Sequence, residues 1–157
     1  MPREVFLELG VDGRCLGRIY IRLFGHLRQA QQFMTLCMGT MGPSFLGTRA
    51  SEKVRNILVF KSAVDKNNQS FGQGLMMGLE WGGQHSMTET EGLVTGMAGN
   101  NGTAFGICTQ GQTNAAMHAP FGEVVAGLEV AQDAFQHNPV TEVTITRCGL
   151  VLPGLSQ

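Results

Sequence analysis

The segment 96–109, GMAGNNGTAFGICT, has the residue types that best fit a binding or catalytic site. Glycines and other small residues surround Phe105 and then give way to a short apolar run. Such a segment typically forms a loop in which the backbone comes close to another group, followed by a strand. The sequence therefore predicts a close approach of backbone to a ligand or a neighbouring segment here.

Other kinds of chemistry find little support in the residue pattern. The chain shows neither a Ser-His-Asp nor a Cys-His arrangement of the kind that activates a nucleophile, and its glycine-rich segments read as turns between short strands rather than phosphate-binding loops. The four cysteines, Cys15, Cys37, Cys108 and Cys148, are far apart and lack the close spacings of zinc sites. We expect them to be buried free thiols in a reducing compartment, and we expect no metal and no cofactor.

Composition and charge narrow the class of partner. The chain has 157 residues, a formal net charge of −1 and 15% charged residues, whereas about 25% is usual. A sparsely charged surface suggests contact with another protein, and the scattered Lys and Arg residues argue against nucleic acid. No apolar run approaches the ~18 residues that span a bilayer, and the first residues lack the pattern of a signal peptide. We therefore expect an intracellular protein, cytoplasmic or nuclear, that does not bind membranes.

The elements that must position the candidate site are mostly short strands. Alternating apolar residues at 5–9 and 17–24 flank Asp12-Gly13, a strong hairpin signal. Apolar residues at three- and four-residue steps predict one helix from Gly25 to Gly39 and a second from Leu128 to Phe135. Further strands are predicted at 53–64, 91–99, 105–109, 121–127 and 141–152, while 71–83 remains unassigned. This pattern indicates a single all-β domain over residues 1–157, a closed antiparallel barrel with a helix at each end. A domain cut from a larger multidomain protein would look the same.

Four stretches, read in order, carry a resemblance to a known family. They are VFLELGVDGRCLGRIYIRLF at 5–24, AQQFMTLCMG at 30–39, the segment 96–109, and FGEVVAGLEVAQDAF at 121–135 followed by TITRCGLV at 144–151. Together they resemble the opening hairpin, first helix, central loop and strand, and closing elements of the cyclophilin family of peptidyl-prolyl isomerases. The resemblance spans nearly the whole chain and implies a closed eight-stranded antiparallel β-barrel capped by two α-helices.

The resemblance also implies which residues would form the site. Isomerisation of an X-Pro bond must lower a rotational barrier of roughly 18–20 kcal/mol. Cyclophilins do so with an apolar pocket for the proline ring and an arginine that favours the twisted amide. The matching arginine here is Arg55, with Arg49 as the alternative if the alignment shifts. The residues that match the peptide-binding groove are Phe60, Met97, Ala104, Phe105, Gly106 and His118.

Several positions depart from the family pattern. Lys61 and Ala63 stand where the family has a pocket methionine and the glutamine that steadies the arginine. Ala104 and Gly106 replace a glutamine and the phenylalanine that forms the pocket floor. Thr113 and Asn114 fall where a tryptophan and a leucine form the pocket wall and the cyclosporin contact. These losses predict that proline is held poorly and that cyclosporin does not bind.

Each matching residue has a plain structural interpretation beside the functional one. Arg55 is either a catalytic arginine or a solvated strand arginine, and His118 is either a pocket residue or a loop histidine. Phe60 and Phe105 fit the core better than a ligand contact. Trp81, outside the matching stretches, could anchor a partner or cover the barrel.

Three functional hypotheses follow. The first is a cyclophilin-like protein-interaction or scaffold domain, with a protein or peptide partner, whose prolyl isomerase activity is lost or strongly reduced. The second is a weakly active isomerase that uses Arg55. The third is a purely structural module that holds neighbouring domains together.

Overall fold

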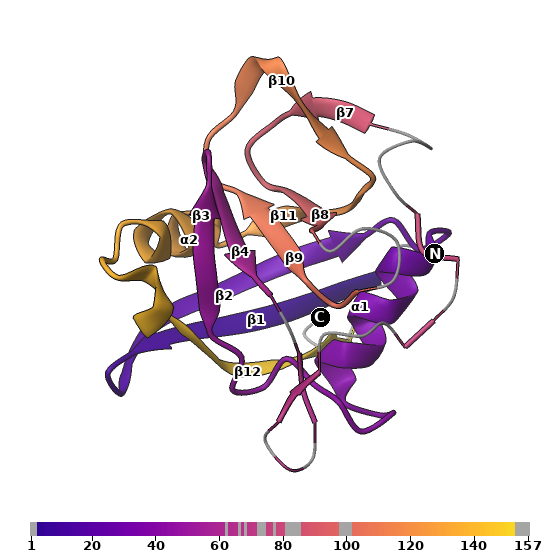
Figure 1. Cartoon of the computed structure of the whole chain (residues 1–157), viewed down its shortest axis with the longest axis vertical. Helices are drawn as coiled ribbons and strands as arrows, with labels where there is room; N and C mark the ends of the chain where they lie inside the picture. The colour runs from indigo at the N-terminus through magenta and orange to yellow at the C-terminus, as the bar shows by residue number, and fades with distance from the viewer. Residues whose placement is uncertain are drawn as a thin grey trace.

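The computed structural model describes residues 3–61, 63–65, 67, 69–71, 75–76, 78–80, 86–97 and 102–152, and it is dominated by β-strands (Figure 1). The strands are β1 (Arg3–Val11), β2 (Arg14–Leu23), β3 (Ala50–Val54), β4 (Ile57–Phe60), β5 (Ala63–Val64), β6 (Ser70–Phe71), β7 (Ser86–Glu89), β8 (Leu93–Gly96), β9 (Phe105–Cys108), β10 (Gln112–His118), β11 (Pro120–Ala126) and β12 (Thr144–Val151). The helices are α1 (Arg28–Met38), α2 (Leu128–Phe135) and the short 3-10 helix η1 (Val140–Glu142).

One curled antiparallel sheet forms the body of the molecule. Its eight strands lie in the order β12-β1-β2-β11-β8-β9-β4-β3, and α1 and α2 lie on opposite sides of it in Figure 1. The two edges approach each other at the start of β3, where the Ile145 amide donates to the Thr48 carbonyl at 2.8 Å and the Ala50 amide donates to the Val143 carbonyl at 2.9 Å. Within the described residues no ladder continues along β3 and β12, so the sheet is a half-barrel rather than a fully closed barrel.

The opening hairpin forms as the sequence predicts. Asp12 and Gly13 take left-handed backbone conformations, with φ of 52° and 76°, which matches the twist of two antiparallel strands. The next predicted element, α1, ends at Gly39, whose φ of 68° allows its N–H to reach the Thr35 carbonyl. The structure confirms both elements. They were predictable because their signals are local in the sequence.

A carboxylate from a distant loop caps the start of α1. Leu27, the residue before the helix, makes no side-chain cap. Instead the two carboxylate oxygens of Glu80 accept from the backbone N–H groups of Arg28 and Gln29, each at 2.9 Å. These bonds satisfy two of the free amides that every helix start presents. Glu80 is thereby held against the start of the helix.

Five phenylalanines fill the space enclosed by the curled sheet and α1. The ring of Phe33, on α1, lies 4.9 Å from Phe45, 4.8 Å from Phe105 and 5.1 Å from Phe121, measured between centroids. Phe60 stacks on Phe105 at 5.0 Å. Because such rings are close-packed and dry, this cluster dominates the core.

The structure corrects three expectations. The single strand predicted at 53–64 is interrupted, because this range covers the end of β3, all of β4 and all of β5. A turn at Arg55 and Asn56 separates β3 from β4, and Arg55 adopts a φ of 52° there without the glycine that usually marks such a turn. The ribbon of β7 and β10 was not predicted, since its residues are polar and lack alternation. Cys15 is exposed, whereas Cys37 and Cys108 are buried free thiols and Cys148 is half-buried.

Candidate functional site

Arg55 lies in the turn between β3 and β4 and is held by an ion pair. Its Nη2 lies 2.6 Å from the Oε1 of Glu89, and its Nε donates to the same oxygen at 3.2 Å. The Glu89 side chain is fully buried, whereas that of Arg55 is 47% exposed. Arg55 is therefore neither on a strand nor simply solvated, since it neutralises a buried carboxylate 34 residues away.

Glu89 is the last residue of β7, which belongs to a separate two-stranded ribbon. In this ribbon β7 pairs with β10, opposing Glu89 to Gln112 and Met87 to Met117. The other carboxylate oxygen of Glu89, Oε2, is buried and has no hydrogen-bond partner within the described part of the chain. A buried charge is costly unless it is paired, so Arg55 supplies the main compensation for burying Glu89.

Cys108, on β9, lies in the same electrostatic neighbourhood. Burial raises the pKa of its thiol to about 11, and the negative charges of Glu89 and Glu91 act in the same direction. A backbone hydrogen bond at Gln110 acts in the opposite direction, lowering the pKa and offsetting part of this effect. The Sγ itself donates to the Gln110 carbonyl at 3.4 Å. Cys108 is thus protonated at neutral pH, and a thiol in that state is a poor nucleophile.

The two groove phenylalanines lie in the core. Phe60 and Phe105 are 0% and 1% exposed, and they stack against each other on the inner face of β4 and β9. This confirms the structural interpretation of both residues. Ala104, one residue before Phe105, is also buried.

Gly106 lies on the opposite, outer face of β9, and that face is filled. A Cβ atom built on Gly106 would lie 2.5 Å from Cγ2 of Ile57 and 3.2 Å from Sδ of Met97. The approach to Ile57 is shorter than Cβ contacts in proteins, and the approach to Met97 is tighter than most of them. Side chains of the protein itself therefore occupy the space beside Gly106.

A second, smaller apolar cluster covers this outer face. It consists of Ile57, Val59, Leu93, Cys108 and Met117, with Phe24, Val54 and Met97 packed at its margin. Met117 comes from β10 and is only 2% exposed, so the ribbon contributes a side chain to the cluster. Strands β4, β8 and β9 are consequently buried on both faces, as sheet strands are when each face is covered.

The structure describes only some of the remaining predicted site residues. The backbone of His118 ends β10 opposite Ser86, and its side chain lies outside the described parts. Trp81 and residues 98–101 also lie outside the described residues. Lys61 is exposed and forms a 3.4 Å ion pair with Glu52. The predicted site residues therefore lie in three different environments: Phe60 and Phe105 in the core, Gly106 on a covered outer face, and Arg55 in an ion pair.

Sequence reasoning missed three residues of the site: Glu89, which pairs with Arg55, Ile57, which fills the space beside Gly106, and Met117, which belongs to the outer apolar cluster. Glu89 is one acidic residue in the polar stretch 86–90 and carries no motif. Its burial arises from tertiary packing between segments far apart in the sequence. A pattern within one segment could not have identified it.

Two open hollows lie elsewhere on the surface. One lies between the end of β2 and α1, and the other is lined by residues of α2 and by Glu91, Thr109 and Gln110. Neither is lined by Arg55 or by a predicted groove residue. Among the residues that the structure describes, no three His, Cys, Asp or Glu side chains come together as a metal site would require.

The fold and the site define a β-dominated protein built on an eight-stranded, curled antiparallel sheet. In the described parts of the chain, no helix has the length and apolar character needed to cross a bilayer. No family model matches the chain.

Proposed function

We propose that this chain is a divergent cyclophilin-like domain that has lost most or all prolyl isomerase activity and works by binding a protein or peptide partner. In this proposal the curled sheet corresponds to most of a cyclophilin-like barrel. The hydrogen bonds between residues 48–50 and 143–145 bring the two edges of the sheet together and so support this correspondence.

The observation that carries the loss of activity is the covered face beside Gly106. A proline ring needs a dry cavity of its own size, whereas Ile57 and Met97 already fill the space where a single additional carbon would clash. Displacing two packed side chains exposes apolar surface to water, which costs about 25 cal/mol of free energy per Å² exposed. A substrate would have to offset that cost before any catalysis began.

The second support is the engagement of Arg55. An arginine that stabilises a twisted amide must donate to the peptide, while two of the Arg55 donor nitrogens are directed at Glu89. Withdrawing them would leave a buried carboxylate without its cation. The ion pair therefore competes directly with catalysis.

One observation favours the alternative of a slow isomerase. The Arg55 side chain is 47% exposed, so part of its guanidinium remains open to solvent. A weak, Arg55-dependent activity would follow if a peptide reached this open side.

Exchange NMR on a short Xaa-Pro peptide separates the two alternatives. The wild-type chain, the Arg55→Ala variant and a matched Arg14→Ala control, altered at an exposed arginine, are each added in catalytic amount. We expect the cis–trans exchange rate to equal the uncatalysed rate in all three samples. A rate increase that the Arg55→Ala variant lacks and the Arg14→Ala control retains would establish the slow isomerase instead.

A further inference from the structure

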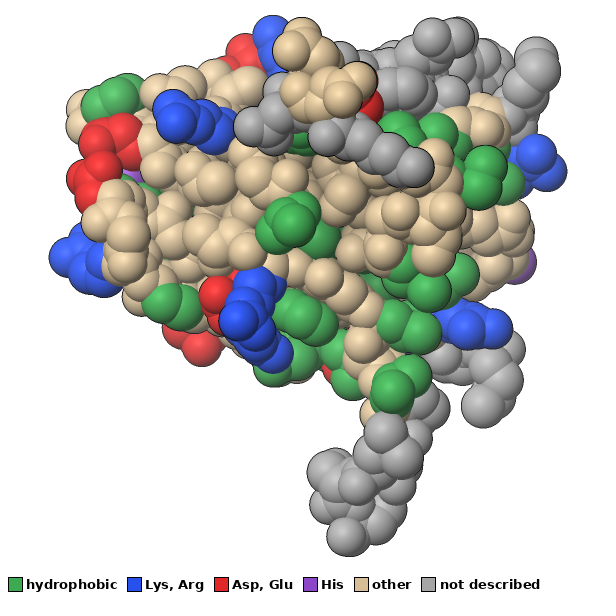
Figure 2. All heavy atoms as spheres, turned by 90° about the horizontal axis from the view of Figure 1, so that it is seen from below, with side chains coloured by type: hydrophobic (Ala, Val, Ile, Leu, Met, Phe, Trp, Pro, Cys, Tyr) green, Lys and Arg blue, Asp and Glu red, His purple; other side chains and the backbone are tan. Residues whose placement is uncertain are grey.

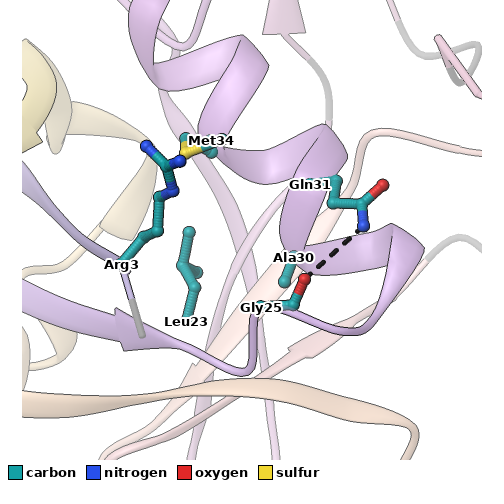
Figure 3. A pocket seen from close by; sticks show the side chains of 6 residues that line it. All are labelled: Arg3, Leu23, Gly25, Ala30, Gln31 and Met34. Carbon is teal, nitrogen blue, oxygen red and sulfur yellow. Dashed lines mark hydrogen bonds between the residues drawn. The ribbon is translucent and has the colours of Figure 1, made fainter. Parts of the chain in front are cut away.

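The hollow between the end of β2 and α1 has features of a small binding site. Its volume is about 240 Å³, and it is lined by Arg3, Leu23, Gly25, Ala30, Gln31 and Met34 (Figure 3). In this view Arg3 and Met34 stand on one side and Gln31 on the other, with Leu23 and Ala30 between them. The hollow shares no lining residue with the Arg55–Glu89 pair or with the apolar cluster beside Gly106.

The floor of the hollow is apolar and firmly placed. Leu23 is 2% exposed and Ala30 is 1% exposed, since both also belong to the main core. Met34 is half-buried and packs against the same core. A flexible thioether beside fixed aliphatic groups suits small apolar groups of varied shape.

The rim of the hollow carries an unneutralised positive charge. Arg3 is exposed, and among the described residues its side chain has neither an ion pair nor a hydrogen bond. No acidic residue lines the hollow among the described residues, and two acids of other elements are engaged elsewhere: Glu80 accepts from the start of α1, and Glu123 pairs with Arg22. An incoming anion at Arg3 would therefore meet an available partner.

Gln31 provides a second polar group on the facing side. Its Nε2 donates to the Gly25 carbonyl at 3.5 Å, the long limit of a hydrogen bond (Figure 3). Because that bond is weak, the amide can turn to donate to a ligand at small cost. The rim thus offers two hydrogen-bond donors above an apolar floor.

Size and charge together define the class of ligand. Sites for cofactors and drug-sized molecules occupy about 300–1,000 Å³, more than this hollow provides. One acidic side chain with a short aliphatic neighbour fits both the volume and the polarity. We propose that this hollow binds an aspartate or glutamate of a partner polypeptide, with its carboxylate at Arg3 and Gln31 and an adjacent aliphatic side chain on Leu23, Ala30 and Met34.

This proposal goes beyond the loss of isomerase activity and does not rest on it. A chain with measurable isomerase activity could bind an acidic segment in this hollow equally well. The two proposals therefore succeed or fail in separate experiments.

The test is an NMR titration of the ¹⁵N-labelled chain with the peptide acetyl-Val-Glu-Val-amide. We expect saturable shifts in the amides of Leu23, Gly25, Ala30 and Met34. The matched peptide acetyl-Val-Gln-Val-amide is expected to bind about fivefold or more weakly, because a charge-assisted hydrogen bond is about twice as strong as a neutral one. Binding should also weaken in 1 M NaCl, where exposed charges are screened.

Two variants complete the design. Arg3→Gln should reduce the affinity for the glutamate peptide about fivefold. Arg14→Gln, which alters an exposed arginine at the far end of the β1–β2 hairpin, should leave it unchanged. Both changes lie at exposed positions, so an unchanged NMR spectrum elsewhere verifies the fold. Equal binding of the two peptides, equal binding by Arg3→Gln, or shifts clustered away from this hollow would each overturn the proposal.

Discussion

Phe60 and Phe105 stack face to face, with ring centroids 5.0 Å apart and planes inclined by 12°. Through Phe105 this pair is continuous with Phe33 and Phe45, so the strands β4 and β9 are joined to α1 by a single aromatic cluster. The strands whose outer face is covered by Ile57 and Met97 are therefore packed on their inner face against this cluster.

Truncating the aromatic cluster should destabilise the whole domain. Phe105→Ala removes a ring that contacts three others, and we expect a loss of about 3–5 kcal/mol in the free energy of unfolding. Urea denaturation followed by circular dichroism measures the change. Met41→Ala, at a position that is 67% exposed, serves as control and should stay within about 0.5 kcal/mol. A loss below about 1 kcal/mol for Phe105→Ala would mean that the cluster is not the main core.

The Arg55–Glu89 pair should show a measurable coupling energy. In a double-mutant cycle of Arg55→Gln and Glu89→Gln we expect about 1–2 kcal/mol, because removing Arg55 leaves a buried carboxylate without its cation. The exposed pair of Lys61 and Glu52, with side chains 66% and 45% accessible, is the matched control. Its coupling should be about 0–0.5 kcal/mol. Similar coupling in the two cycles would show that the burial of Glu89 contributes nothing.

Stability should fall in alkaline solution because of the buried thiols. The pKa of Cys108 rises from 9.0 to about 11 on folding, and burial also raises the pKa of Cys37. A raised pKa means that the unfolded chain loses its thiol protons first. The contribution to stability is therefore complete below pH 9 and is lost as pH rises toward 11. Denaturation midpoints measured from pH 8 to 11 should decrease, and the decrease should be smaller in Cys108→Ala. A pH profile identical in the two proteins would contradict this assignment.

The parts of the fold that sequence predicts are those with local signals. Asp12-Gly13 marks the first hairpin, Gly39 ends α1, and the predicted bounds of α2 from Leu128 to Phe135 are confirmed. The turn at Arg55 and Asn56 was missed because an arginine with positive φ carries no sequence signature. The hydrogen bonds between residues 48–50 and 143–145 could not be predicted, because they join segments that no local pattern relates.

The candidate site was predictable to a smaller extent. Burial of Phe60 and Phe105 follows from their place in apolar strands. The partner of Arg55 did not follow, because Glu89 belongs to a polar ribbon whose packing is tertiary. Gly106 indicated the loss of a large side chain, while the atoms that took its place, from Ile57 and Met97, became evident only in three dimensions.

The hollow beside α1 lies outside the segments that resemble a catalytic site. Arg3, Gln31 and Met34 are ordinary residues of a strand and a helix, and each has common structural roles. Only their convergence around Leu23 gives them a shared role. Figure 2 shows one face of the surface, on which Lys and Arg side chains lie at both ends and hydrophobic side chains are scattered between them.

The pairing of β1 with β12 determines when the domain can be completed during synthesis. Thr146 donates a hydrogen bond to the Glu8 carbonyl across a sequence separation of 138 residues. On the ribosome, β1 and β2 can pair early, while the other edge of β1 stays without its native neighbour until β12 has emerged. An unpaired edge can recruit strands from other chains, and sheets joined by such distant segments fold slowly. Nascent chains of this protein are thus expected to need shielding of β1, for example by a chaperone, until residues 144–151 are available.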